Sequence, residues 1–375
     1  MEPTIPRSKA IRLCLVSALL AAMLTAGLGG YLLYSFGAIG KIYGIVNLLE
    51  KTFYKDVDRA KLLEGAARGV VAGLGDPYSV YMTKQEWEEF LIRTSGEYSG
   101  IGVNIGVKDG RVQIISPIKG TPAEKAGLKA NDVILKVDGK PVSTSDEAAS
   151  LIRGPAGTEV TLTIFRDGES FDVSIVRQEI SIPAVDYSMK EPGIGYIELS
   201  SFNEHSYMEM AKALSDLKSQ GAKAIILDLR YNGGGLLDQC TAIAELFVPK
   251  GPIVTLKGKS VPESTQESKG QGLGLPLFVL VNEGSASASE ILAGAIQDRK
   301  AGILIGTTTF GKGLVQNSYR LRDGSVVKVT IAEYLTPNGR AINGKGLEPD
   351  IKIEGDEAQM AKAMELARIE AAKNR

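Results

Sequence analysis

Residues 222–248 read AKAIILDLRYNGGGLLDQCTAIAELFV. The run AKAIILDLR is typical of a strand buried on both faces, because its apolar residues are nearly continuous. The run LLDQCTAIAELFV predicts a helix. Gly233 to Gly235 lie between the two, where glycine lets backbone N–H groups face a ligand. The stretch therefore predicts a strand, a turn and a helix, and the turn is either a binding element or simply a tight connection.

Strands and helices alternate on both sides of this unit. The strand candidates are GYIELSSF (195–202), LPLFVLVN (275–282) and AGILIGTTTF (301–310), and the helix candidates are SYMEMAKALSDLKSQG (206–221) and SASASEILAGAIQD (285–298). Such alternation favours an α/β core of βαβ units, which we assign to residues 181–354. A hairpin follows at 317–335, and KGKSVPESTQESKGQGLG (257–274) is typical of a mobile loop.

Two further regions precede the core, and one follows it. Residues 41–95 carry apolar residues at helical spacing and predict a helical cap that packs or dimerises. Residues 96–180 contain short β-type runs joined by Asp-Gly turns, with one helix that begins at Ser145. This pattern favours a small, partly open barrel inserted between the cap and the core. Residues 355–375 predict a polar C-terminal helix.

The N-terminus indicates a membrane segment. Residues 13–36 carry no charge, and Arg7, Lys9 and Arg12 precede them. That length spans a bilayer, and the basic flank at 1–12 should stay in the cytoplasm. We therefore expect a single-pass signal anchor with the catalytic part outside the cytoplasm. The alternative is a cleaved signal peptide, although the apolar run is longer than usual for one.

Composition excludes several classes of function. The net charge is −1, which does not favour a nucleic-acid partner. Two cysteines, Cys14 and Cys240, cannot form a disulfide framework, and with the single histidine they give no metal-ligand spacing. The turn at Gly233 does not match the phosphate-loop pattern. We therefore expect neither a metal nor a cofactor.

The stretch GSASASEI (284–291) lies where a strand ends and a helix begins, which is where α/β sheets place their ligands. Ser287 and Glu290 fit a capping box, and the helix N-terminus would stabilise an oxyanion. A serine nucleophile needs a base. His205 starts an amphipathic helix and is a weak candidate. Lys312, between two glycines and far from other charges, could be desolvated and so act as a base.

These residues together resemble the carboxyl-terminal processing proteases, the tail-specific serine peptidases that carry a PDZ domain. The resemblance covers roughly residues 40–360. It rests on an ordered set of motifs, which are LGDPYSVYM (74–82), YSGIGV (98–103), DLRYNGGG (228–235), SASASEI (285–291), TTFGKGLVQ (308–316) and NGKGLEPDI (343–351). No single motif is decisive, but the order is specific to the family.

The resemblance implies roles for individual residues. It makes Ser287 the nucleophile, Lys312 the general base and Gln316 the residue that orients the lysine. A spacing of four between Lys312 and Gln316 suits one helical turn. The implied oxyanion hole consists of the backbone N–H of Ala288 and that of Gly233 or Gly234. Asp228, Arg230 and Asn232 would brace the turn.

The resemblance also makes 96–180 a PDZ domain, which captures a peptide C-terminus. The carboxylate loop would be Gly100, Ile101, Gly102 and Val103. Leu151 and Ile152, on the helix that lines the groove, imply substrates with apolar C-termini. Arg153 is a candidate for reporting peptide binding to the core, or simply a cation at a helix C-terminus.

The function implied is a membrane-anchored serine endopeptidase that recognises protein C-termini and cleaves through an acyl-enzyme. Two alternatives stay open. One is a non-catalytic PDZ scaffold on a protease-like core, and the other is a Ser–Lys amidohydrolase that acts on cell-wall peptides. A homodimer through the helical N-terminal region is a further expectation.

Overall fold

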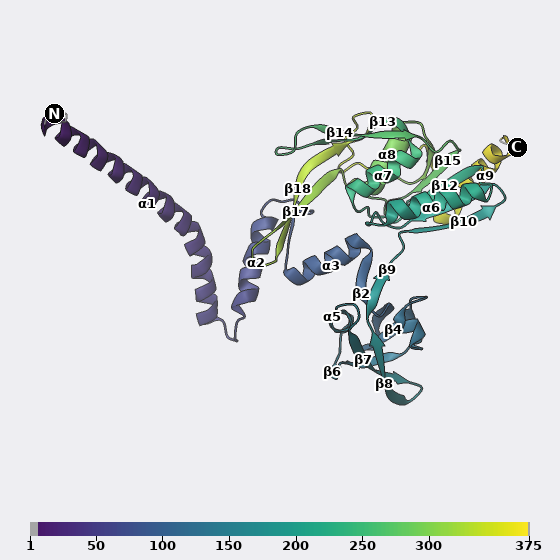
Figure 1. Ribbon diagram of the computed structural model, residues 1–375, viewed down its shortest axis with the longest axis horizontal. Coiled ribbons are helices and arrows are strands. Elements are labelled where there is room, and N and C mark those ends of the chain that lie inside the picture. The colour runs from purple at the N-terminus through teal and green to yellow at the C-terminus, as the bar shows by residue number, and fades with distance from the viewer. Residues whose placement is uncertain (1–6, 374–375) are drawn as a thin grey trace, which may run out of the picture. The chain divides into compact units, whose positions relative to one another are not determined.

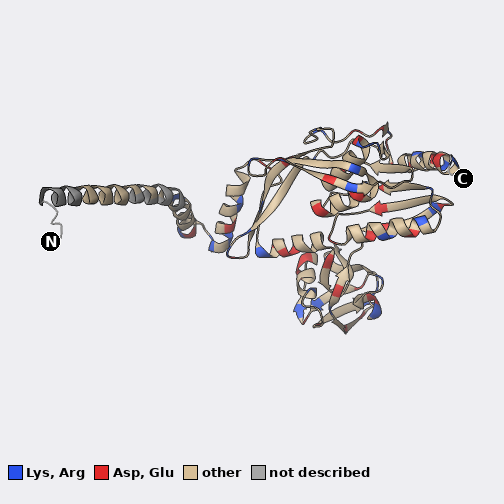
Figure 2. Cartoon of the chain, turned by 45° about the horizontal axis from the view of Figure 1, so that its top comes forward, with Lys and Arg blue, Asp and Glu red and all other residues tan. Residues whose placement is uncertain are grey.

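The computed structural model describes residues 7–373, apart from the side chains at 7–15, 28–30, 32–36, 38–39 and 93. The chain divides into two compact units. One comprises Met1–Thr83 with Tyr319–Lys328, and the other comprises Lys84–Ser318 with Val329–Arg375. Each is described by itself. Acidic and basic residues are interspersed along the helices of the second unit (Figure 2).

The first unit is mainly helical. Its elements are α1 (Arg7–Thr52), α2 (Arg59–Ala72), β1 (Val80–Met82) and the tip of a hairpin. Asp58 caps α2, because its Oδ1 accepts the N–H of Ala60 at 2.9 Å. β1 pairs antiparallel with residues 326–328. The helical prediction for 41–95 thus omitted one short strand.

The apolar stretch 13–36 lies within α1, but the predicted transmembrane helix is not supported. Within the described part of the chain, no helix is sufficiently long and apolar to cross a bilayer. Several side chains of the stretch, including those at 32–36, lie outside the described residues. Among those that are described, Ser17 and Thr25 are polar, and the Thr25 hydroxyl donates to the carbonyl of Ala21 at 2.8 Å.

The second unit begins with α3 (Lys84–Ser95) and then forms the inserted domain. Its strands are β2 (Glu97–Gly100), β3 (Val103–Lys108), β4 (Arg111–Pro117), β5 (Val133–Val137), β6 (Lys140–Pro141), β7 (Glu159–Arg166), β8 (Glu169–Val176) and β9 (Gln178–Ser181), and its helices are α4 (Pro122–Lys125) and α5 (Ser145–Ile152). The main sheet has the order β3-β4-β5-β7-β8, and β2 pairs with β9.

The Asp-Gly turns of this domain are confirmed. Asp109-Gly110, Asp138-Gly139 and Asp167-Gly168 all have positive φ at both residues, as a type I′ turn requires. The cap of α5 differs by one residue from the prediction. Thr144 rather than Ser145 is the N-cap, and its hydroxyl accepts the Glu147 N–H at 3.2 Å.

The core contains a six-stranded sheet in the order β10-β11-β12-β15-β16-β19, parallel except for β10 at one edge. The strands are β10 (Val185–Glu191), β11 (Ile194–Leu199), β12 (Ala224–Asp228), β15 (Leu277–Val281), β16 (Ile303–Gly306) and β19 (Ile351–Lys352). Every residue of β12 and β15 is buried. Continuous apolar runs produce this pattern when helices cover both faces of a sheet.

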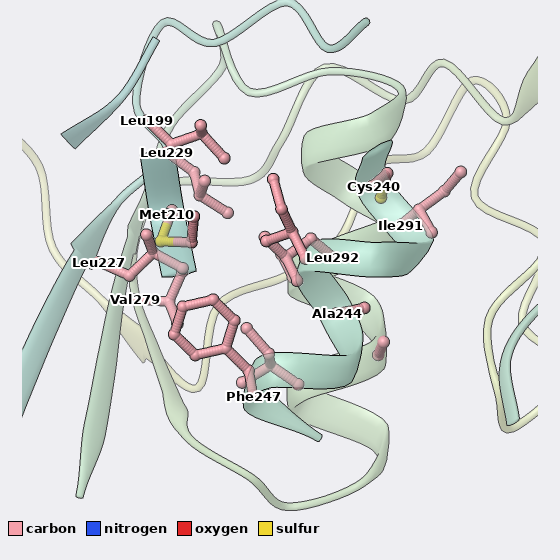
Figure 3. Packing of buried hydrophobic residues seen from close by; sticks show 14 of the residues in the cluster. Leu199, Met210, Leu227, Leu229, Cys240, Ala244, Phe247, Val279, Ile291 and Leu292 are labelled. Carbon is pink, nitrogen blue, oxygen red and sulfur yellow. The ribbon is translucent and has the colours of Figure 1, made fainter. Parts of the chain in front are cut away.

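Helices cover the two faces unequally. The helices α6 (Ser206–Ser219), α7 (Leu237–Phe247) and α8 (Ala288–Asp298) pack on one face, and α9 (Asp356–Lys373) packs on the other. Figure 3 shows Phe247 of α7 beside Val279 of the sheet, and Leu292 of α8 belongs to the same buried cluster. Figure 1 shows α7 and α8 side by side, and in the chain α7 follows the loop that leaves β12 and α8 follows the loop that leaves β15.

Further strands complete the core. They are β13 (Pro249–Lys257), β14 (Ser264–Gln271), β17 (Leu314–Arg320) and β18 (Val326–Leu335). The expected mobile loop at 257–274 is wrong in part, because β14 pairs antiparallel with β13 over most of its length. Most of β14 is exposed, so its sequence carries no apolar alternation that would have marked a strand.

Candidate active site

Three serines lie between β15 and the first turn of α8, and the structure distinguishes them. The Ser285 hydroxyl is buried and donates to the carbonyl of Leu229 at 2.8 Å. The Ser289 hydroxyl is also buried and donates to the carbonyl of Asn232 at 2.8 Å. Ser287 is partly exposed at the N-cap of α8. Two serines therefore fasten the loop, and the third is accessible.

Ser287 adopts a strained backbone conformation. Its φ is 57° and its ψ is −114°, a region that residues other than glycine rarely adopt. Such strain costs of order 1–3 kcal/mol and persists only when the surroundings hold it. Strained residues cluster at active sites, so the conformation marks Ser287 as a candidate functional residue.

The glycine turn after β12 contacts the serine loop. A Cβ on Gly234 would lie 2.8 Å from the Ala286 oxygen, 2.9 Å from the Ala288 nitrogen and 2.9 Å from the Ser287 Cβ. Gly234 also has a φ of 99°. Only glycine permits this approach and this backbone conformation together. The predicted nucleophile and the predicted oxyanion loop are thus adjacent.

The N–H groups of the glycine turn and of the first residue of α8 differ in whether they are already hydrogen-bonded. The Gly234 N–H donates to Asn232 Oδ1 at 2.9 Å, so it is already engaged. The N–H groups of Gly233 and Ala288 have no hydrogen-bond partner among the residues that the structure describes. Ala288 begins α8, where the helix dipole also favours negative charge. These two N–H groups are the available donors for an oxyanion.

Buried polar residues hold the turn in place. Asn232 is fully buried, donates to the Leu199 carbonyl at 2.6 Å and accepts the Ala286 N–H at its own carbonyl. Asp228 accepts three bonds from the Arg230 guanidinium and one from the Tyr196 hydroxyl at 2.9 Å. Burial and the adjacent Asp228 raise the pKa of Tyr196, so its hydroxyl keeps its proton.

Glu290 connects the serine to the lysine. It is fully buried, and its Oε2 accepts the Ser287 N–H and the Lys312 N–H, each at 2.9 Å. The two backbone nitrogens are therefore separated by at most twice that distance. Oε1 accepts the Gly311 N–H at 2.7 Å and the Thr309 hydroxyl at 2.5 Å. The capping-box pattern indicated the Ser287 half of this arrangement, but not the lysine half.

Lys312 and Gln316 are related differently from the prediction. Lys312 is half-buried in the loop before β17, and Gln316 lies within β17. The spacing of four, which would suit one helical turn, therefore does not fall on a helix. The Gln316 side-chain amide donates to the Thr330 hydroxyl at 3.3 Å. A role for Gln316 in orienting Lys312 stays a prediction.

Two other side chains that could take part in catalysis, those of His205 and Cys240, do not belong to this site. His205 is the N-cap of α6, and its Nε2 lies 2.9 Å from Glu97 Oε1 without hydrogen-bond geometry. Cys240 is fully buried, and its thiol donates to the Ala288 carbonyl at 3.1 Å. Burial raises the pKa of Cys240, so it stays a thiol and is not a competing nucleophile.

The inserted domain contains a groove of about 550 Å³. Ile101, Gly102 and Val103 line it, as predicted for the carboxylate loop, and Gly100 precedes them at the end of β2. The Ile101 carbonyl accepts the Ala123 N–H at 2.8 Å, which braces this loop. Its other lining residues are Ile92, Tyr98, Asn104, Ile105, Ile115, Ile118, Ala149, Ile152, Arg153 and Ile182.

The helix α5 contributes to the groove with a different set of residues from the predicted one. Ala149 and Ile152 of α5 and the C-cap residue Arg153 line the groove, whereas Leu151 packs against the domain's hydrophobic core. The Arg153 guanidinium lies over the Tyr98 ring, 6.0 Å from its centroid. Burial raises the pKa of Tyr98 more than the nearby Arg153 lowers it. Arg153 is thus a groove residue.

Three family models match separate parts of the chain. The model of peptidase family S41 matches residues 193–353, a PDZ domain model matches 113–166, and the model named "Activating protease CtpB N-terminal domain" matches 33–86. The resemblance drawn from the ordered motifs is thereby confirmed at the level of the family. The fold is that of an S41 protease with a PDZ domain, and the domain boundaries that we predicted stay predictions.

Two related proteases are similar in sequence to this chain over most of its length. A probable CtpA-like serine protease of Staphylococcus aureus (strain N315) is 40% identical over 322 residues, which are 84% of this chain and 65% of that protein. The carboxy-terminal processing protease CtpA of Bacillus subtilis is 41% identical over 324 residues, 85% of this chain and 69% of that protein. The chain thus spans 65% of the length of the staphylococcal relative.

Solved structures agree with this assignment. A photosystem II D1 C-terminal processing protease has a TM-score of 0.50 and 32% identity, and the match covers 83% of this chain and 86% of that one. An S41 protease from Bacteroides fragilis has a TM-score of 0.51 at 17% identity, covering 84% of this chain and 91% of that one. The second likeness concerns the fold alone.

Proposed function

The chain belongs to peptidase family S41, and from that premise we propose that it is a serine-type endopeptidase that processes protein C-termini through a Ser–Lys mechanism. The observation that carries the proposal is the pair of bonds to Glu290. One buried carboxylate oxygen accepts the N–H of both Ser287 and Lys312. The backbones of the accessible Ser287 and of Lys312, which lies in a separate loop, are therefore fixed by the same carboxylate oxygen.

The reaction follows from the groups around Ser287. Neutral Lys312 takes the proton of the Ser287 hydroxyl as the oxygen attacks the substrate carbonyl. The N–H groups of Gly233 and Ala288 stabilise the negative charge that develops on the carbonyl oxygen. Lys312 then gives the proton to the leaving amine, and the acyl-enzyme forms. Water, deprotonated by Lys312, releases the acid and restores the serine.

The substrate class follows from the PDZ groove. Its lining is mostly apolar, and Ile101, Gly102 and Val103 of the expected carboxylate loop belong to it. We propose that protein C-termini with apolar side chains bind there before cleavage. Arg153 is the candidate that reports occupancy, because it lies in the groove and on the ring of Tyr98.

The decisive experiment is cleavage of a peptide with an apolar C-terminus by the wild type, Ser287→Ala and Lys312→Ala. Both variants should lose activity, by about 100-fold to 10,000-fold for the base. A protein that binds the peptide but cleaves nothing would be a scaffold. Activity on muropeptides but not on proteins would indicate a wall amidohydrolase. The amidated peptide is the control for recognition of the free carboxylate.

Assembly and location are further proposals. The first unit exposes large apolar side chains on α1 and α2, namely Tyr43, Ile45, Leu48, Leu63 and Val70. These favour a homodimer through the helical region, which sedimentation of the wild type against Leu63→Glu would test. Location at a cell membrane rests on the sequence 1–36, and fractionation of the full chain against one lacking these residues would test it.

A further inference from the structure

Glu290 is unusual among the buried acids because its four donors are neutral groups from two separate segments. The Ser287 N–H belongs to the start of α8, whereas the N–H groups of Gly311 and Lys312 and the Thr309 hydroxyl belong to the loop before β17. Each carboxylate oxygen receives two donors. A helix cap needs only the first bond, so the other three require a separate reason.

Tyr334 makes a second connection between the same segments. It is fully buried, its hydroxyl donates to the Ser287 carbonyl at 3.1 Å, and its N–H donates to the Gly313 carbonyl at 3.0 Å. The peptide groups on both sides of the Ser287 Cα are thus fixed, one by Glu290 and the other by Tyr334. Residues 311 to 313 are held by the Glu290 carboxylate, which accepts the N–H groups of Gly311 and Lys312, and by the backbone N–H of Tyr334, which donates to Gly313.

The strain at Ser287 makes these bonds consequential. A residue with a φ of 57° and a ψ of −114° relaxes unless its neighbours hold it. A change of about 1 Å in the position of a reacting group can slow catalysis about 100-fold. The backbones of Ser287 and Lys312 are both bound to Oε2 of Glu290. These bonds therefore control the distance between the serine hydroxyl and the lysine amine, on which proton transfer depends.

We infer that Glu290, assisted by Tyr334, is a positioning residue that fixes the nucleophile Ser287 relative to the base Lys312. This rests on the proposed function, and it assigns to the third residue of a helix cap a task beyond capping. The carboxylate is required because all four groups that reach it donate. A glutamine of the same shape would turn an NH₂ group towards two of these donors and lose their bonds.

The test compares Glu290→Gln with Glu209→Gln in the full chain. Glu209 is a matched control, because its Oε2 accepts the N–H groups of Ala184 and Val185 elsewhere in the same core. We expect Glu290→Gln to lower kcat and the rate of Ser287 labelling by a fluorophosphonate about 100-fold. KM and PDZ-peptide affinity should stay unchanged. Glu209→Gln should leave kcat within about twofold at matched folded fraction.

A second variant decides the matter if Glu290→Gln does not fold. Tyr334→Phe removes only the hydroxyl bond to Ser287 and should lower kcat about threefold to tenfold, the equivalent of one hydrogen bond. Full kcat in either folded variant, or a kcat loss in Glu290→Gln that Glu209→Gln reproduces, would overturn the inference. If the inference fails but the wild type cleaves peptides and Ser287→Ala does not, the proposed function still holds. If the wild type itself has no peptidase activity, the proposed function is contradicted.

Discussion

Asp132 in the PDZ domain and Glu290 in the protease core are both buried carboxylates, and their hydrogen bonds are satisfied in different ways. Asp132 in the PDZ domain accepts hydrogen bonds from Nε and Nη2 of Arg166, each at 2.6 Å, and from the Lys129 N–H at 2.8 Å. Glu290 in the core receives neutral donors from two segments. A bidentate ion pair holds two elements together, whereas four convergent neutral donors also fix the relative positions of the backbone groups that donate.

The two regions also use glycine for different purposes. Gly234 in the core brings the turn against the serine loop, and Gly102 in the PDZ domain brings the carboxylate loop against Thr121. In the proposed function, the first approach belongs to the reaction site and the second belongs to peptide recognition. A comparison of matched glycine variants can therefore separate chemistry from binding.

The largest effect is expected in the core. Gly234→Ala places a Cβ within 2.9 Å of the Ala286 oxygen, the Ala288 nitrogen and the Ser287 Cβ, at a φ of 99°. Turnover of a short peptide should fall by more than about 100-fold, as when an oxyanion donor is displaced. Gly233→Ala is the control, since its Cβ meets nothing within 4 Å and its N–H is retained. Equal losses in the two variants would contradict the assignment of Gly233 as a donor.

The next effect concerns the PDZ domain. A Cβ on Gly102 would lie 2.4 Å from two atoms of Thr121, at a φ of 75°. Gly102→Ala should weaken peptide binding about tenfold or more, while turnover of a substrate too short for the groove is preserved. Gly110→Ala is the control, because Gly110 has a similar φ of 71° but open space around it. Calorimetry with a peptide gives the affinity, and a loss of short-substrate turnover would join the two regions functionally.

A smaller effect is expected from the ion pair. Burial would raise the pKa of Asp132, but the bonds from Arg166 and Lys129 outweigh it and lower the pKa below the ordinary value. The pair therefore stabilises the PDZ domain above the pKa of Asp in the unfolded chain, and this stabilisation is lost as the pH falls through the lower folded value. Hydrogen exchange of residues 103–176 in the full chain would measure it.

Arg166→Met should accelerate that exchange at pH 7, and it should abolish the loss of protection, relative to intrinsic exchange, that the wild type shows as the pH falls below the ordinary pKa of Asp, about 3.9. Exchange in the six-stranded sheet of the core should stay the same. A variant whose PDZ domain keeps the wild-type acid dependence would show that another carboxylate carries the effect.

The smallest effect is expected at His205. Its side chain is 39% exposed and lies beside Glu97, not beside Ser287. His205→Ala should change kcat/KM by less than about threefold, measured on the same short peptide. A loss beyond about 100-fold would mean that the histidine takes part in catalysis and that the Ser–Lys mechanism is wrong.

The sequence predicted those parts of the fold that local patterns determine. AIILD and LFVLV are buried strands because their apolar runs are continuous, and the Asp-Gly pairs form turns because they tolerate positive φ. The strand β14 was missed, since an exposed edge strand has no apolar alternation. The transmembrane helix was inferred from an uncharged run and is not supported.

The candidate site was predictable to a lesser degree. Ser287 and Lys312 follow from the motif resemblance, and Glu290 was recognised only as a cap. That its carboxylate also holds Lys312 depends on a loop 22 residues away in the chain, which no local pattern reports. The choice of Gly233 over Gly234 likewise depends on one bond from the Gly234 N–H to Asn232.

The pairing of β2 with β9 has a consequence for engineering. Entry and exit of the PDZ domain run side by side, with Glu97 opposite Ser181 and Gly100 opposite Gln178. A domain whose two connections already meet can be exchanged for another without stretching its host, and a short linker can replace it at little cost in loop entropy. The stem at 97–100 and 178–181 is therefore a natural cassette boundary, at which foreign recognition modules could be grafted to redirect the peptidase to chosen protein tails.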